Sequence, residues 1–343
     1  MPNELWSAAI HRRFHCLRVF IVFQIFKNVK HSLPIRTLKA KKAGMNSRTP
    51  KNAMLYQITH ATTYEYSASV SLCQNLAHLT PRSTAQQQCQ QTGLSINPQP
   101  SVLSSRTDYF GNQLTFFAVQ EPHRKLTITA NHLVEVTPPA PVDASSTPPW
   151  EEVRDRIRVN RTDDGLKAYQ FTFASRHVPF STELADYARG SFTAGRPLAE
   201  AVLDLTARIH SDFEYDPQAT TISTPIHEVF QQRRGVCQDF SHLQISCLRS
   251  LGLAARYVSG YLRTMPQPGK PRLVGADATH AWVSVLCPEI GWFDVDPTNN
   301  LQPSDKHVVL AWGRDFDDVS PVKGVILGGE KHSIGVSVDV SEV

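Results

Sequence analysis

The chain has 343 residues, of which 41% are hydrophobic and 19% are charged, a composition that excludes a collagen-like or broadly disordered protein and allows roughly two domains with their own cores. The formal net charge of +4 is unevenly spread, because residues 1–53 carry 11 Lys and Arg against one acid, which leaves 24 basic and 30 acidic residues to the rest. Residues 54–343 are therefore mildly acidic and lack the excess of basic residues that binds nucleic acid, so nucleic acid is not expected as a partner.

Residues 1–53 form a basic leader with three competing interpretations. Its apolar stretch VFIVFQIF (19–26) is shorter than the ~20 residues that cross a bilayer, so no membrane span is expected. Gln24 interrupts the stretch and lysines follow it, whereas a signal peptide would end in a small-residue cleavage site. A basic tail that contacts nucleic acid or a membrane surface is the second interpretation. We favour the third, a disordered or mis-started leader, because Met45 and Met54 stand just before sequence of ordered pattern.

From Met54 onward, polar residues alternate with β-branched and aromatic ones, which is the period-two pattern of half-buried strands. The stretch YQITHATTYEYSASVSL (56–72) predicts a pair of strands, and further strands are expected at 94–100, 108–119 and 125–136. Several short strands without a helix predict an all-β, sandwich-like N-terminal domain over residues 54–136. The Pro- and Ser-rich stretch 137–152 is expected to be a linker.

Residues 153–335 are predicted to form an α+β domain, followed by a C-terminal tail at 336–343. Helices are expected at 184–192 and 197–216, and the second has an apolar stripe made of Leu198, Val202, Leu205 and Ile209. Another helix is predicted to begin at Cys237 and to end before Gly252, which stands where a C′ glycine terminates a helix. Antiparallel strands are then expected at 254–262, 280–287 and 291–297.

The cysteines of the chain are sparse and irregularly spaced, unlike those of a small secreted disulfide scaffold. None forms a CxxC pair, so a thioredoxin-like motif or a zinc knuckle has no support, and a cytoplasmic address with reduced thiols is expected. The six are Cys16, Cys73, Cys89, Cys237, Cys247 and Cys287.

Cys237 is the candidate nucleophile. At a helix N-terminus, free backbone N–H groups and the positive end of the helix dipole stabilise a thiolate. The same N–H groups could bind an oxyanion that develops on a carbonyl, and Gly235 leaves room for a substrate to approach. Cys247 lies further along the apolar face of the same helix and is expected to be a core residue.

His280 opens a predicted strand, where its ring could act as a base that faces a cleft. Asp294 and Asp296 lie two residues apart on the next strand and therefore share a face, so either could accept the Nδ1–H of His280. Asp296 stands closer to His280 if the two strands form a hairpin, but both carboxylates could equally face solvent. A zinc site is not expected, because Cys237 and His242 point to different faces of one helix and no short paired spacing is present.

Two longer stretches resemble the bacterial transglutaminase-like family, which is often described as a group of cysteine proteases: GVCQDFSHLQISCLRSLGLAARYVSGYL (235–262) and DATHAWVSVLCPEIGWFDVDPTNN (277–300). The resemblance includes DYFGN (108–112) in the β-rich part and continues through HVVLAWGRDFDDVSPVKGVILGG (307–329). It implies a papain-like fold, in which a helix presents a thiol to a histidine and an aspartate on a neighbouring antiparallel sheet. The family's Cys-His-Asp triad falls on Cys237, His280 and Asp296.

The resemblance further implies acyl transfer or hydrolysis at a carboxamide or peptide bond through a thioester, with no cofactor or metal. Water as the acceptor would make the protein a peptidase or amidase, and an amine would make it a transglutaminase; the sequence leaves this open. The substrate would be a peptide, a protein or a small molecule that contains an amide. A non-catalytic binding or scaffold module on the same fold is the alternative.

The remaining site candidates have structural interpretations as well. The candidates for an oxyanion donor or for a wall of the cleft are Tyr215, Gln238, Asp277 and Trp282. Tyr215 is the named candidate for the second oxyanion donor, although it could equally be a packing aromatic. Two further residues are expected to be structural: Asp239 as a cap of the first helical turn, and His242 as a buried, hydrogen-bonded residue.

Overall fold

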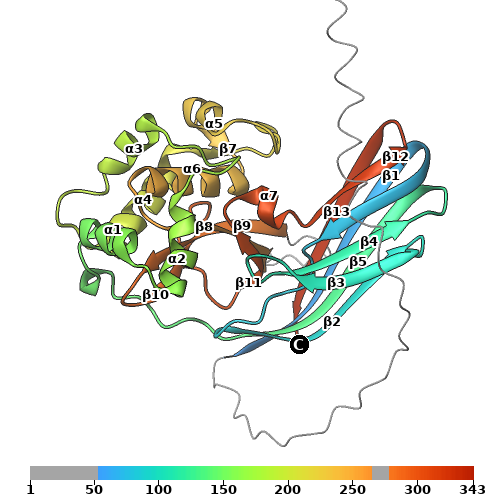
Figure 1. Ribbon diagram of the computed structural model, residues 1–343, viewed down its shortest axis with the longest axis horizontal. Coiled ribbons are helices and arrows are strands. Elements are labelled where there is room, and N and C mark those ends of the chain that lie inside the picture. The colour runs from blue at the N-terminus through green and yellow to red at the C-terminus, as the bar shows by residue number, and fades with distance from the viewer. Residues whose placement is uncertain (1–52, 265–277) are drawn as a thin grey trace, which may run out of the picture. The chain divides into compact units, whose positions relative to one another are not determined.

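The computed structural model describes residues 53–264 and 278–343 (Figure 1). The basic leader, apart from its last residue, and the candidate Asp277 therefore lie outside the described residues. No helix in the described ranges is both long and apolar enough to cross a bilayer.

The β-rich part of the chain is built around β1, a strand of 24 residues. The other strands of its sheet follow in the order β2-β5-β1-β4-β3, and β12 and β13 pair with β1 as well. The bounds of these strands are β1 (Met54–Ala77), β2 (Gln87–Asn97), β3 (Val102–Thr107), β4 (Gln113–Val119), β5 (His123–Val136), β12 (Val322–Gly328) and β13 (His332–Glu342).

The two halves of β1 belong to two parts of this sheet. The first half pairs with β5 and β13, and the second half pairs with β4 and β12, with a register shift between Glu65 and Val70. Apolar side chains of both parts pack into one cluster that includes Val70, Phe117 and Ile128, so the arrangement is sandwich-like, as predicted. The predicted pair of strands over residues 56–72 is wrong, because one continuous strand covers that stretch. The stretch has no Gly, Pro, Asn or Asp to make a turn, and alternation alone does not tell one long strand from two.

The last strands of the chain return to this first sheet. β13 runs antiparallel to β1, with Tyr56 opposite Glu342 and Tyr66 opposite His332. This differs from the sequence-based expectation, which placed residues 322–335 in the second domain and 336–343 in a tail. The pairing covers an edge of β1 that would otherwise present unpaired N–H and C=O groups.

The helices α1 to α6 fall between residues 150 and 250 and form a group of their own in Figure 1, whereas α7 lies nearer the C-terminus, at residues 316–319. Leu198, Val202, Leu205 and Ile209 are fully buried, which confirms the apolar stripe predicted for α4. Two short strands, β6 (Glu214–Tyr215) and β7 (Arg234–Gly235), pair in parallel beside the helices. The helices are α1 (Trp150–Val159), α2 (Asp163–Tyr169), α3 (Thr182–Arg189), α4 (Leu198–Asp212), α5 (Ile226–Gln232), α6 (Cys237–Ser250) and α7 (Phe316–Val319).

A four-stranded antiparallel sheet of order β10-β9-β8-β11 packs against α6. The helix ends as predicted, since Gly252 adopts a left-handed conformation with φ +82° just after it. Helices leading into an antiparallel sheet give the α+β class expected from the sequence. The strands are β8 (Ala255–Leu262), β9 (Ala278–Cys287), β10 (Gly291–Val295) and β11 (His307–Gly313).

Candidate active site

Cys237 is the first residue of α6, and its position is set by a hydrogen-bonded cap. The buried carboxylate of Asp239 accepts the backbone N–H of Val236 at 2.9 Å and the hydroxyl of Thr220 at 2.6 Å. This confirms Asp239 as the cap of the first helical turn. A Cβ on Gly235 would lie 2.8 Å from an oxygen of Asp239, so only glycine allows the chain to pass this close to the cap.

His280 lies between a carboxylate and the candidate thiol. Its Nε2 donates to Oδ2 of Asp296 over 2.7 Å, and the Cys237 thiol lies close enough to the same imidazole to raise its pKa. Because Nε2 is engaged by Asp296, the contact with the sulfur falls to Nδ1. The expectation that the aspartate would accept the Nδ1–H is wrong, because Nε2 is the nitrogen that donates to Asp296.

The two aspartates of β10 and the turn after it have different partners. Asp296 contacts His280, whereas Asp294 accepts the indole N–H of Trp282 at 2.8 Å. The strand register explains the difference, since Asp294 stands opposite Ser284 and Asp296 is one pleat closer to His280.

The carboxylate of Asp296 is fully buried and accepts five hydrogen bonds. Its Oδ2 receives His280 Nε2, the side-chain amide of Asn299 at 2.7 Å and His307 Nε2 at 3.2 Å. Its Oδ1 receives the backbone N–H groups of Thr298 and Asn299 at 2.9 and 3.2 Å. Sequence reasoning missed Asn299 and His307; the only available signal was that His307, like His280, stands at the start of an apolar strand.

These contacts determine the charges in the site. Burial alone would raise the pKa of Asp296, but the hydrogen bonds from His280, His307 and Asn299 outweigh it and hold the pKa below its usual range. Burial would likewise lower the pKa of His280, but its hydrogen bonds to Asp296 and Cys237 and their negative charges raise that pKa to about 10. At neutral pH His280 is therefore protonated and forms an ion pair with the carboxylate of Asp296.

His280, Asp296 and His307 also bring potential metal-ligand atoms within 4.8 Å of one another. Both imidazoles, however, point an Nε2–H at the same carboxylate oxygen. A cation would have to displace both protons, so the three side chains form a hydrogen-bonded network and not a ready set of metal ligands.

The other described candidates for the cleft, Tyr215, Gln238 and Trp282, differ in how far they are buried. Tyr215 on β6 stands opposite Gly235 in the parallel pair, and 54% of it is exposed. Burial of its ring raises the pKa of Tyr215, and the nearby Cys237 adds to this shift. Gln238 is half-buried in the first turn of α6.

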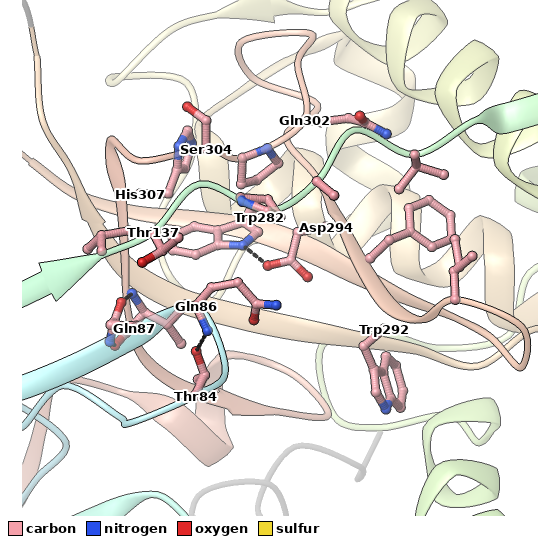
Figure 2. A pocket seen from close by; sticks show the side chains of 18 of the residues that line it. Thr84, Gln86, Gln87, Thr137, Trp282, Trp292, Asp294, Gln302, Ser304 and His307 are labelled. Atoms are coloured by element: carbon pink, nitrogen blue, oxygen red, sulfur yellow. Dashed lines mark hydrogen bonds between the residues drawn. The ribbon is translucent and has the colours of Figure 1, made fainter. Parts of the chain in front are cut away.

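Trp282 is fully buried behind the base. Its ring centroid lies 6.1 Å from that of His280, and the two planes are inclined by 29°. On its other side is a cavity of about 590 Å³, lined also by Asp294, His307, Thr84 and Thr137 (Figure 2). Trp282 thus contacts His280 and also lines this cavity, whose lining includes neither His280 nor Cys237.

Comparison with known families identifies both parts of the chain. Residues 56–135 match the family model described as bacterial transglutaminase-like N-terminal region, and residues 185–297 match the model of the transglutaminase-like superfamily.

Several known proteins are similar to this chain. An uncharacterized protein of Mycobacterium tuberculosis (strain H37Rv) is 44% identical over 293 residues, which cover 83% of this chain and 92% of the relative. A protein-glutamine gamma-glutamyltransferase of Pseudomonas aeruginosa is 31% identical over 128 residues, which cover 32% of this chain and 19% of that protein. The crystal structure of a predicted cysteine protease from Cytophaga hutchinsonii has the same fold, with a TM-score of 0.67 and 22% identity over 85% of this chain and 92% of that one.

Proposed function

Because the chain belongs to the transglutaminase-like superfamily and has the N-terminal region of its bacterial members, we propose that it is a thiol enzyme that transfers or hydrolyses acyl groups at a carboxamide or peptide bond. Members of this superfamily are typically cysteine enzymes. The observation that supports the proposal most directly is the hydrogen bond of 2.7 Å between His280 and Asp296, on an imidazole whose pKa Cys237 also raises.

In the first half of the proposed reaction, the thiolate of Cys237 attacks the carbonyl carbon and forms a C–S bond. The backbone N–H groups at the start of α6 stabilise the oxyanion. The imidazolium of His280 donates its Nδ1 proton to the nitrogen that leaves as the C–N bond breaks, which yields a thioester and an amine or ammonia. Asp296 holds the ring in the required orientation through Nε2.

In the second half, His280 takes a proton from water or from an amine, which attacks the thioester and releases Cys237. With water the product is a carboxylic acid, and with an amine it is a new amide. We propose a glutamine side chain as the first donor to test, because the Pseudomonas relative is a protein-glutamine gamma-glutamyltransferase. Tyr215 is the proposed second oxyanion donor.

The test is a screen of glutamine-containing peptides with and without a primary amine, read by mass spectrometry. Deamidation alone would identify a hydrolase, and incorporation of the amine would identify a transferase. The Cys237→Ala variant should lose all turnover, whereas Cys89→Ala, which removes a half-buried thiol in the β-rich sheet, should keep it. Turnover that persists without Cys237 would overturn the proposed nucleophile.

Alkylation by iodoacetamide separates an enzyme from a scaffold on the same fold without a known substrate. Near neutral pH, Cys237 should react much faster than the buried thiols of Cys73, Cys247 and Cys287. Its rate should fall in His280→Ala, because the ion pair is lost. If Cys237 reacts no faster than an unstructured thiol, the scaffold function is favoured.

We also propose the cytoplasm as the compartment. Among the described residues, Cys73, Cys89, Cys237, Cys247 and Cys287 are free thiols, the form that a reducing compartment maintains. Fractionation of the native host, followed by detection of the chain with an antibody, tests this assignment, and recovery outside the cytoplasmic fraction would contradict it.

A further inference from the structure

We propose that His307 is a positioning residue of the site: it shares the carboxylate of Asp296 with His280 and ties that carboxylate to the sheet, so that the imidazole is held toward Cys237. The inference rests on the proposed function, because it concerns the same ion pair. His307 contacts neither the thiol nor a reacting atom, and it acts only through Asp296.

The geometry defines which atoms carry hydrogen. His307 Nε2 lies 3.2 Å from the same Oδ2 that accepts His280 Nε2 at 2.7 Å, and the centroids of the two imidazole rings are 5.9 Å apart. An ionised carboxylate only accepts hydrogen bonds, so both histidines must present an N–H to it. A single oxygen therefore receives two imidazole donors from two different strands.

The other donors to Asp296 are local to it. Thr298 and Asn299 follow Asp296 within three residues and move with the same turn. Within the described ranges, His280 and His307 are the donors from outside this turn, and His280 is the group that must itself be oriented. Because His307 is the first residue of β11, its hydrogen bond to Asp296 connects the turn at residues 296–299 to the sheet.

The surroundings of His307 are suited to this role. Its side chain is 3% exposed, and its ring packs edge-on against Trp282 with centroids 5.2 Å apart. Its Nδ1 is buried and has no hydrogen-bond partner in the part of the chain that the structure describes, so the hydrogen bond that this ring makes there is the one from Nε2. Two titratable groups contact this ring, Asp296 through a hydrogen bond and His280 through its imidazole, and Asp294 lines the same cavity as His307.

His307 and Trp282 also line the cavity of about 590 Å³ (Figure 2), whereas Asp296 is not among its lining residues. Asp296 itself is completely buried. Since hydrogen bonds to a carboxylate are stronger when water is excluded, the two rings protect the contact that orients His280.

Three variants distinguish the effect of the His307 hydrogen-bond donor from the effect of its ring. His307→Phe keeps a ring against Trp282 and removes the donor, His307→Gln keeps an amide donor near the position of Nε2, and His280→Ala removes the base. His132→Phe is the matched control, because His132 is also buried, with its Nδ1 bonded to Thr92 within the β-rich sheet. The readouts are the rate of Cys237 alkylation by iodoacetamide near neutral pH and the melting temperature.

We expect His307→Phe to slow alkylation by at least about tenfold, the usual effect of removing a group that orients a functional side chain, with a melting temperature close to that of the wild type. His307→Gln should stay within about threefold of the wild type, and His132→Phe should not change the rate. Once a substrate is known, the same loss should appear in kcat and not in KM.

The outcomes distinguish the inference from the function on which it rests. If His280→Ala alkylates as fast as the wild type, the ion pair and the proposed function both fail. If His280→Ala is slow but His307→Phe is as fast as the wild type, only the role of His307 is overturned. If His307→Gln is as slow as His307→Phe, or if the rates simply follow the melting temperatures, the donor at His307 has no positioning role.

Discussion

Gly260 on β8 lies directly opposite His280 on β9, and the space that a side chain at position 260 would fill is occupied by the indole of Trp282. A Cβ there would be 2.5 Å from Cη2 of Trp282 and 2.2 Å from the carbonyl oxygen of Val308. The glycine thus lets Trp282 lie flat on the sheet beside the base.

Gly260→Ala should therefore destabilise the protein by about 1–3 kcal/mol, as overpacking does, and should also slow the alkylation of Cys237. Urea unfolding and iodoacetamide kinetics measure the two effects. Gly93→Ala is the matched control, because a Cβ on this strand glycine would only meet Asn131 O at 3.9 Å. Equal stability of the two variants would contradict the packing argument.

The charge of His280 gives a prediction for the alkaline range. Its pKa is raised to about 10, above the value of about 6.5 for an unfolded histidine. Its contribution to the free energy of unfolding is therefore complete below about pH 6.5 and is lost as the pH rises through about 10.

The 15N shifts of the imidazoles, followed by NMR from pH 6 to pH 11 after selective histidine labelling, test this directly. The spectrum of His280→Ala assigns the resonance. Cys237→Ser removes the contribution that Cys237 makes to the raised pKa of His280, so this pKa should be lower in the variant than in the wild type. A wild-type His280 that titrates near pH 6.5 would rule out the ion pair.

The hydrogen-bonded cap of α6 should contribute to the free energy of unfolding. Asp239→Ala leaves the N–H of Val236 and the hydroxyl of Thr220 without their acceptor, which we expect to cost about 1–3 kcal/mol in the free energy of unfolding. Asp239→Asn keeps an acceptor oxygen and should cost less. Glu183→Ala, which removes an exposed acid from the first turn of α3, should change stability by no more than about 0.5 kcal/mol. If Asp239→Ala lowers the free energy of unfolding no more than Glu183→Ala does, the cap contributes little to stability.

The proposed role of Tyr215 predicts a kinetic effect without a structural one. Tyr215→Phe removes only the hydroxyl of a ring that is 54% exposed, so the melting temperature should not change. If the hydroxyl donates to the oxyanion, kcat should fall by at least about tenfold with KM unchanged. Tyr109→Phe, at an exposed tyrosine of the β-rich region, serves as the control. An unchanged kcat would remove Tyr215 from the oxyanion site.

The sequence by itself determined the features that depend on neighbours along the chain. The start of α6 at Cys237, its cap by Asp239, its end at Gly252 and the buried stripe of α4 could all be predicted, because helix caps and periodicity involve residues a few positions apart. His280 was a candidate from its place at the start of a predicted strand, and the resemblance of the sequence to a family selected Asp296 over Asp294 as its partner.

Only the tertiary structure decided which atoms meet. Asp294 and Asp296 share a face of the strand by alternation. Only the register between β9 and β10 decides that Asp294 bonds to Trp282 and Asp296 to His280. The pairing of β1 with β13 and the approach of His307 to Asp296 depend on contacts between strands, and alternation within a strand carries no information about which other strand will lie beside it. Long-range pairing is set by the packing of whole faces, so it appears only when the chain is folded.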